Sequence, residues 1–129
     1  MNIEYIPGDL VMVNESALRF AKDKIFKVIS SLSGGFVKVV MLNDSSTTYS
    51  ISNNAVRPIP LTPEILEKNG WEHKYDIYFK EFPHRILAIM DENAYIINEC
   101  CSMFLCPAKF VPQLQHLLFG LGLNSEMEV

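Results

Sequence analysis

Long hydrophobic runs are missing from this sequence of 129 residues. The longest unbroken apolar stretch is Ile86 to Met90, or Leu117 to Leu123 if the glycines are counted. A helix needs about 20 apolar residues to cross a bilayer, so we expect no transmembrane helix. The N-terminal residues also lack the positive charge and the apolar segment of a secretory signal, so we expect none there.

Cysteine is scarce and unevenly placed. Cys100, Cys101 and Cys106 are the three cysteines, and all of them fall within one short stretch. A secreted domain that depends on disulfides usually has an even number of cysteines spread along the chain. We therefore expect a protein of the reducing cytoplasm.

An excess of basic residues is also absent. The net charge is −4, and residues 61–129, with five basic and ten acidic side chains, supply the negative charge. Residues 1–60 have six basic and five acidic side chains, so we expect the two halves to pack together. Nucleic-acid-binding domains normally carry a strong basic excess. The run Arg19, Lys22, Lys24 and Lys27 is nevertheless a candidate nucleic-acid contact, although a solvated loop explains it equally well.

Apolar residues, in contrast, are plentiful. They make up 49% of the chain and include eight Phe, five Tyr and one Trp. A chain of this length buries roughly two-thirds of the surface that its unfolded form exposes, so it can build its own core. This composition excludes a largely disordered chain.

The first half consists of short β-branched and apolar segments separated by turn residues, which indicates β-strands. The expected strands are 9–13, 25–29, 36–42, 47–51 and 55–57, with turns at 43–46 and 52–54. Gly34-Gly35 predicts a hairpin because both glycines can adopt positive φ. Five short strands with a long first loop and a tight last turn predict a small SH3-like barrel over residues 1–59, closed so that no strand edge is exposed.

Pro58-Ile59-Pro60 predicts a stiff junction to a second unit, residues 60–129. A short helix is expected over residues 63–69, because Thr62 is a good N-cap and Pro63 suits the first helical position. Gly70 can end the helix in the left-handed conformation and direct Trp71 back onto it.

The rest of the second half predicts a β-meander and a final helix. Tyr75, Ile77 and Phe79 alternate with other residues as in a half-buried strand, and further strands are expected at 85–90, 94–97 and 103–105. The apolar stripe of the final helix comprises Val111, Leu114, Leu117, Leu118 and Leu121, with Gln113, Gln115 and His116 off it. The expected fold class is therefore β-rich α+β, an SH3-like barrel followed by a helix–β-meander–helix unit.

Two stretches carry a resemblance to known proteins. Pro-Ile-Pro-Leu-Thr-Pro-Glu-Ile-Leu-Glu-Lys-Asn-Gly, residues 58–70, and the helix that contains Val111-Pro-Gln-Leu-Gln115 are similar to segments of short, uncharacterised proteins of gut anaerobes. Many of these proteins belong to prophages or other mobile elements, and the family has no assigned activity. The opening Gly8-Asp9-Leu10-Val11 resembles the start of a KOW-type or SH3-like barrel, which implies a fold and no activity.

Several residues invite a catalytic or metal-binding interpretation. Cys100, Cys101 and Cys106 could supply zinc ligands, but their spacing is not that of a zinc knuckle, and free cysteines commonly act as small buried residues. A Cys–His pair with His73, His84 or His116 as the base would need an orienting group and an oxyanion hole, for which no signature exists.

Two further groups have structural explanations. Asp91-Glu92 suits a solvated hairpin turn better than acid–base catalysis. The aromatic residues of the first half either line a groove or fill the core, and we expect most of them in the core; they are Tyr5, Phe20, Phe26, Phe36 and Tyr49.

No catalytic residue, metal or cofactor is therefore expected. The leading hypothesis is a non-enzymatic binding or accessory protein of phage or mobile-element origin that contacts another protein. The alternatives are a nucleic-acid-binding accessory protein that uses the basic residues 19–27, and a small cysteine-based metal site or enzyme.

Overall fold

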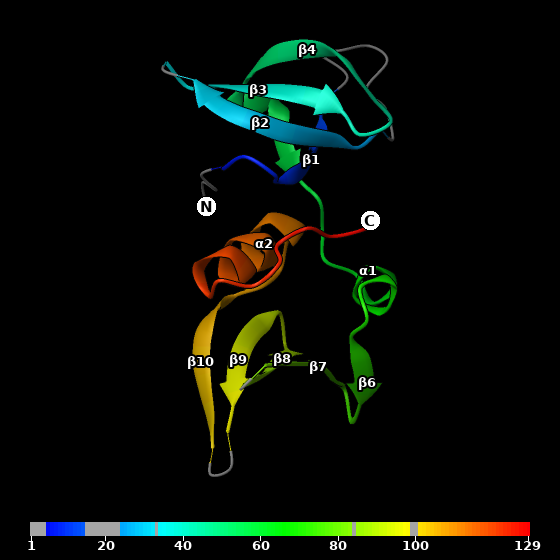
Figure 1. Ribbon diagram of the computed structural model, residues 1–129, viewed down its shortest axis with the longest axis vertical. Coiled ribbons are helices and arrows are strands. Elements are labelled where there is room, and N and C mark those ends of the chain that lie inside the picture. The colour runs from blue at the N-terminus through cyan, green and yellow to red at the C-terminus, as the bar shows by residue number, and fades with distance from the viewer. Residues whose placement is uncertain (1–4, 15–23, 33, 84, 99–100) are drawn as a thin grey trace.

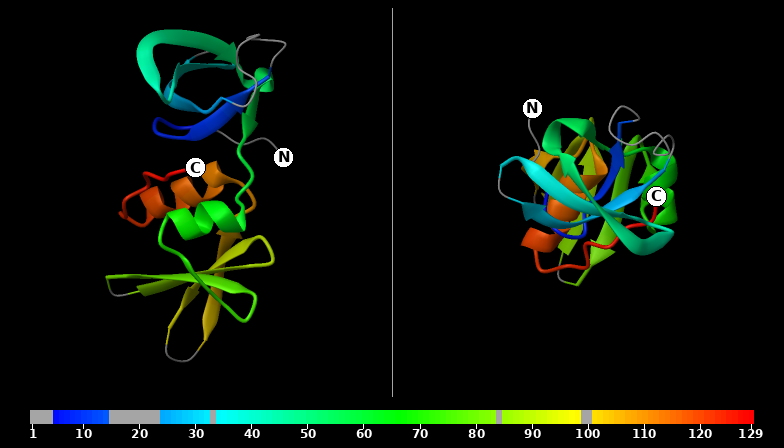
Figure 2. Two further views of the ribbon diagram at one scale, coloured as in Figure 1. Left: turned by 90° about the vertical axis from the view of Figure 1, so that its right-hand side faces the viewer. Right: turned by 90° about the horizontal axis from the view of Figure 1, so that it is seen from above.

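The computed structural model describes residues 5–14, 24–32, 34–83, 85–98 and 101–129. The chain forms three layers along its longest axis, in which two helices lie between a sheet of the first half and a sheet of the second (Figures 1 and 2). This arrangement confirms a β-rich α+β fold with few helices.

The first sheet is antiparallel and has the strand order β4-β3-β2-β1-β5. Its strands are β1 (Leu10–Val13), β2 (Phe26–Leu32), β3 (Phe36–Met41), β4 (Asp44–Ser52) and β5 (Val56–Pro58), and the 3-10 turn η2 (Asn53–Ala55) precedes β5. Gly34 and Gly35 both have a φ of 81°, as the predicted hairpin requires.

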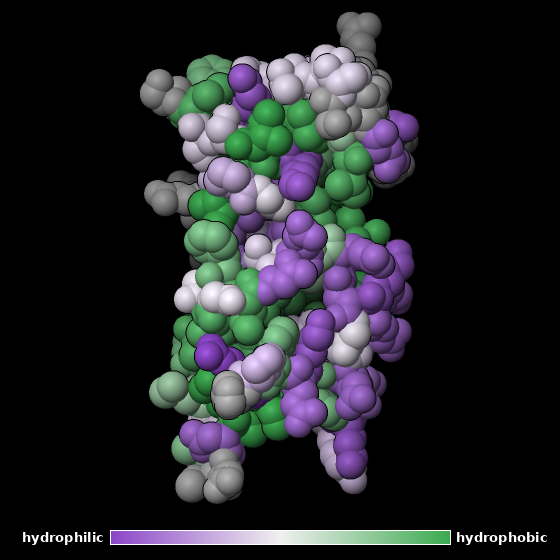
Figure 3. Space-filling view, in the orientation of Figure 1, coloured by the Kyte–Doolittle hydropathy of each residue, from purple (hydrophilic) through white to green (hydrophobic). Residues whose placement is uncertain are grey.

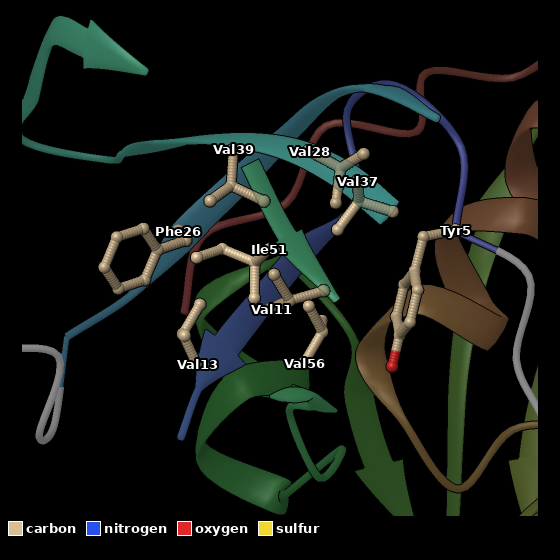
Figure 4. Packing of buried hydrophobic residues seen from close by; sticks show 9 residues of the cluster. All are labelled: Tyr5, Val11, Val13, Phe26, Val28, Val37, Val39, Ile51 and Val56. Carbon is tan, nitrogen blue, oxygen red and sulfur yellow. The ribbon is translucent and has the colours of Figure 1, made fainter. Parts of the chain in front are cut away.

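The core of the first sheet lies on its concave side (Figure 4). Phe26 and Val28 are buried there while Lys27 between them is exposed, which is the period of two expected for a strand with one buried face. Alternate residues of β3 and β4 meet them, and the cluster comprises Tyr5, Val11, Val13, Phe26, Val28, Val37, Val39, Ile51 and Val56.

The sheet is not the closed barrel that the sequence predicted. β4 and β5 are the two outermost strands, and the described residues form no ladder between them. β5 has three residues and ends in Pro58, which has no N–H, so it offers few backbone groups for a second neighbour after pairing with β1. The turn expected at 43–46 is also shorter, since β4 already begins at Asp44.

The second sheet is a meander with the order β10-β9-β8-β7-β6. Its strands are β6 (Glu72–Lys74), β7 (Ile77–Phe82), β8 (Arg85–Met90), β9 (Asn93–Ile97) and β10 (Ser102–Pro107). Helix α1 (Pro63–Lys68) precedes it and is capped as predicted, since Thr62 Oγ1 accepts a hydrogen bond from the Ile65 N–H at 3.3 Å and Gly70 has a φ of 85°.

The half-buried strand predicted through Tyr75 is wrong at its start. Tyr75 and Asp76 have φ angles of 54° and 62° and form the two-residue turn between β6 and β7, and the Tyr75 side chain is 85% exposed. Positive φ at both positions is what a type I′ hairpin requires, but the sequence has neither Asn nor Gly there to indicate the turn.

Helix α2 (Val111–Gly120) follows β10 and packs on both neighbouring layers. Leu114 and Leu118 join the core of the second sheet, while Val111 packs with Leu10 and Ile59 on the side of the first sheet. Gln115, which the sequence places off the apolar stripe of this helix, is nevertheless buried. It lies where α2 packs against the first sheet. Among the described residues, no helix is both long and apolar enough to cross a membrane.

Candidate functional site

Asp9 is a buried carboxylate at the entrance to β1. Pro7 and Gly8 form a tight turn in which Gly8 has a φ of 98° and the Asp9 N–H donates to the Ile6 carbonyl at 3.1 Å. Pro at the second and Gly at the third position are the residues that a type II turn requires. The turn directs the Asp9 side chain inward, where it is 1% exposed and accepts a hydrogen bond from the Ile6 N–H at 2.9 Å.

His116 of α2 meets this carboxylate. Its Nε2 lies 2.6 Å from Asp9 Oδ2, and its side chain remains partly exposed on the other side. Burial raises the pKa of Asp9, although the Ile6 N–H and His116 partly oppose this rise. The pKa of Tyr5 is also raised, first by its burial and then by the charge of Asp9.

Gln115, the neighbour of His116, joins three parts of the chain. Its Oε1 accepts a hydrogen bond from the Leu10 N–H at 3.0 Å, and its Nε2 donates to the Gly8 carbonyl at 3.0 Å. The same Nε2 donates to the Ser125 carbonyl at 3.2 Å, which holds the C-terminal segment against α2. Asp9, Gln115 and His116 thus connect the first sheet to the helix layer.

An open hollow lies beside His116, where α2 meets the end of β10. Its volume is about 470 Å³, and its described lining is mostly apolar: Cys106, Pro107, Gln113, His116, Leu117, Gly120 and Leu121. Burial raises the pKa of the Cys106 thiol, which disfavours the thiolate that a nucleophile requires. Within the described part of the chain, no hydrogen bond joins Cys106 to His116.

Large apolar side chains are exposed on α2 and β10, the two elements that form the hollow. The register places Met103 on the core side of the sheet, with Ile96 and Leu87, and Phe104 on the opposite side, with Tyr95. Phe119 on α2 is 66% exposed, and Met103 and Phe104 on β10 are 58% and 54% exposed. Hydrophobic residues gather on the side of α2 and β10, whereas hydrophilic residues cover the side of α1 and β6 (Figure 3). We call Met103, Phe104, Phe119 and the hollow the α2–β10 surface.

β10 is also the outermost strand of the second sheet. It pairs with β9, and no described residue pairs with its other side. A bulge between Phe104 and Cys106 interrupts its regular register. The α2–β10 surface therefore combines exposed apolar side chains, a hollow and a free strand edge.

The predicted cysteine cluster divides into residues with different surroundings. Cys101 is exposed, so it is not the buried filler that the sequence suggested; its N–H donates to Asn98 Oδ1 at 3.0 Å. Cys106 is half-buried against the core of the second sheet, and Cys100 lies outside the described residues. The described residues contain no group of three or more His, Cys, Asp and Glu that could hold a metal ion.

Of the remaining candidate histidines, the structure describes only His73. His73 stacks on Tyr78, with 4.5 Å between the ring centroids, and His84 lies outside the described residues. Asp91 and Glu92 are exposed and form the turn between β8 and β9, as expected. Of the basic run, Lys24 and Lys27 are exposed, whereas Arg19 and Lys22 lie outside the described residues, so the nucleic-acid hypothesis stays a prediction.

The expected core aromatics are mostly where the sequence placed them. Tyr5 and Phe26 are buried, and Tyr49 packs edge-on against Phe26 with 6.4 Å between centroids. Phe36 is 46% exposed beside the Gly34-Gly35 turn, and Phe20 lies outside the described residues.

Asp9 and Gln115 were missed as site residues. Asp9 fell within an expected strand and Gln115 on an expected polar face, so neither position carried a sign of burial. The Pro7-Gly8 turn before Asp9 was the available signal, because a tight turn fixes the direction of the next side chain.

No family model, curated protein or solved structure matches this chain. The resemblance to mobile-element proteins of gut anaerobes therefore stays a prediction.

Proposed function

We propose that this chain is a non-enzymatic accessory protein that binds another protein through the α2–β10 surface. One observation carries the proposal: three large apolar side chains are exposed on α2 and β10, the two elements that form an apolar hollow at a free sheet edge. Exposed apolar surface beside a hollow costs free energy in water and is typical of interaction sites. Aromatic and Met side chains are the types enriched at protein interfaces.

The proposal of a binding role is also supported by the chemistry of the hollow. A cysteine nucleophile needs a lowered thiol pKa and a base within hydrogen-bond reach. Burial instead raises the pKa of Cys106, and His116 is engaged with Asp9. The Asp9–His116 pair therefore suits a structural contact between the first sheet and α2 better than a proton-transfer step at Cys106.

At the level of the fold, we propose that residues 1–59 form an SH3-like unit that supports residues 60–129, which carry the α2–β10 surface. The strand order β4-β3-β2-β1-β5 and the turn η2 before the last strand support this assignment. We also propose a cytoplasmic location, supported by the few and clustered cysteines.

A comparative capture experiment tests the binding role. The immobilised chain and its variants Phe104→Lys, Phe119→Lys and Tyr75→Lys are incubated with a lysate of the cells that encode it. Lysine removes an apolar contact and places a charge where a partner would exclude water, so proteins bound through the α2–β10 surface are lost from the first two variants.

Tyr75→Lys is the matched control, because Tyr75 is an exposed aromatic residue at the β6–β7 turn. Retention of the same protein by the wild type and this control, but not by the Phe104 and Phe119 variants, supports the proposal. Equal retention by all four chains, or no retention above empty resin, contradicts it.

A further inference from the structure

We infer that the occupant of the α2–β10 surface is an extended apolar segment of another protein, which adds as a strand to the free edge of β10 and places side chains in the hollow. This inference rests on the proposed binding function. It specifies the chemistry of the partner: a backbone in the β conformation with apolar side chains.

The first support is the character of the β10 edge. Ser102–Pro107 includes no charged side chain, although exposed edges are usually protected by charged residues, above all lysine. The unpaired backbone N–H and C=O groups of such an edge accept an additional strand through main-chain hydrogen bonds. Six residues at about 3.4 Å each give an edge of about 20 Å, enough for a short segment.

The second support is the position of the hollow. Cys106 and Pro107, at the end of β10, form one wall, and Leu117, Gly120 and Leu121 of α2 are among the residues of the other. A strand on the β10 edge therefore runs toward the hollow, into which its side chains on the α2 side can project. A sheet edge beside a helix is a known arrangement for peptide recognition, in which the main chain gives affinity and the pocket gives specificity.

The hollow is also large and apolar enough for this role. Its volume of about 470 Å³ accommodates more than one apolar side chain, and its described lining has no Lys, Arg, Asp or Glu. Because most of the described lining is apolar, apolar side chains gain the most from entering the hollow.

A second copy of this chain fits the edge less well. In a two-fold pair of β10 strands, the bulge between Phe104 and Cys106 would occur on both strands and interrupt the ladder twice. Pro107 further shortens the edge, since it has no N–H to donate. A flexible segment can adjust its register to one bulge, which a folded sheet cannot do.

The test uses a phage-displayed library of random peptides of about 12 residues, selected against the full chain. A selected peptide is then synthesised with N-methyl groups at single positions, each of which removes one backbone donor. Strand addition predicts an alternating pattern, in which every second methyl group weakens binding by about tenfold and the others have little effect.

A substitution at Gly120 tests the hollow without disturbing the fold. Gly120 is the last residue of α2 and lines the hollow, and a Cβ added there meets no atom within 4 Å. The side chain of Gly120→Leu can therefore occupy part of the hollow. Leu and Ala also have a higher helix propensity than Gly, so neither substitution should destabilise α2. We expect Gly120→Leu to lower the affinity for the selected peptide by about tenfold. Gly120→Ala, the matched control, should leave this affinity nearly unchanged.

The outcomes separate this inference from the proposed function. Peptide binding without the alternating pattern, or unaffected by Gly120→Leu, overturns strand addition and leaves a protein-binding surface in place. A library that yields no peptide also overturns it, and sedimentation of the chain as a dimer that Phe104→Lys dissociates would identify a second copy as the occupant. The proposed function fails separately, if the capture experiment shows no difference between the variants.

Discussion

At the scale of single residues, Gln115 is the polar side chain on which the contact between the first sheet and α2 depends. Its amide satisfies the Leu10 N–H and the Gly8 carbonyl, both at the entrance to β1. We expect Gln115→Ala to lower the free energy of unfolding by about 2 kcal/mol or more, because these backbone groups lose their partner.

Urea denaturation of the wild type and the variant measures this loss. Gln115→Glu is an informative control, since it keeps an acceptor for Leu10 but removes the donor to Gly8 and Ser125. An alanine variant as stable as the wild type would contradict the structural role of this side chain.

The raised pKa of Asp9 predicts that the stability of the folded chain depends on pH. Burial raises its pKa in the folded chain, so the folded state holds the proton more tightly than the unfolded state does. The contribution of the Asp9 side chain to stability is therefore greatest below its unfolded pKa, near 3.8, and falls as the pH rises through the higher folded pKa.

Asp9→Asn keeps an acceptor for the Ile6 N–H and removes this titration. We expect the stability of the wild type, measured relative to Asp9→Asn, to decrease as the pH rises across the acid range. Urea denaturation of both chains at a series of pH values between about 3 and 7 checks it. A difference that increases with pH would mean that His116 outweighs the effect of burial.

At the scale of elements, two hairpin turns of the second sheet, β6–β7 and β8–β9, are formed by residues with unfavourable backbone angles. Asp91 and Glu92 have φ angles of 50° and 62°, and those of Tyr75 and Asp76 are 54° and 62°. Asn-Gly is the favoured pair for such turns. We expect the double substitution Asp91→Asn, Glu92→Gly to raise the free energy of unfolding by about 0.5–1 kcal/mol, as measured by urea denaturation.

Glu81→Gly is the matched control, because Glu81 lies within β7 and is not among the residues with positive φ. Glycine there should lower stability by about 0.5–1 kcal/mol. If both changes were destabilising, the left-handed geometry at Asp91 and Glu92 would not be a source of strain.

The elements also differ in how far the sequence predicted them. Helix α1 was predicted because its cap, its first-turn proline and its terminal glycine are adjacent in sequence and act locally. β6 was missed because the Tyr75-Asp76 turn contains neither Asn nor Gly, the residues that most clearly indicate a two-residue hairpin turn. Pairing with β7 determines that turn, and a pairing between strands is not a local property.

At the scale of the whole molecule, the two sheets are joined through the helix layer. Leu10 and Ile59 pack with Val111 in one buried cluster, with Gln115 and the Asp9–His116 pair beside it. We expect the chain to unfold in one transition, because separation of the halves exposes this cluster.

Trp71, the single tryptophan, lies in the core of the second sheet, so its fluorescence reports on that half, whereas far-UV circular dichroism reports on all strands. The two signals should give the same midpoint in urea. Val111→Ala should shift both midpoints together, with a loss of about 1–3 kcal/mol. Two separate transitions would show that the halves are independent.

The sequence by itself determined what depends on neighbouring residues: most of the strands, both helices, the Gly34-Gly35 and Asp91-Glu92 turns, and the burial of Phe26. The tertiary structure decided what depends on distant residues. Asp9 and Gln115 are separated by more than a hundred positions, and the α2–β10 surface exists because β10 has a neighbour on one side and α2 returns beside it. Polarity along the chain indicates which side chains prefer water, but the packing of remote segments decides which of them reach it.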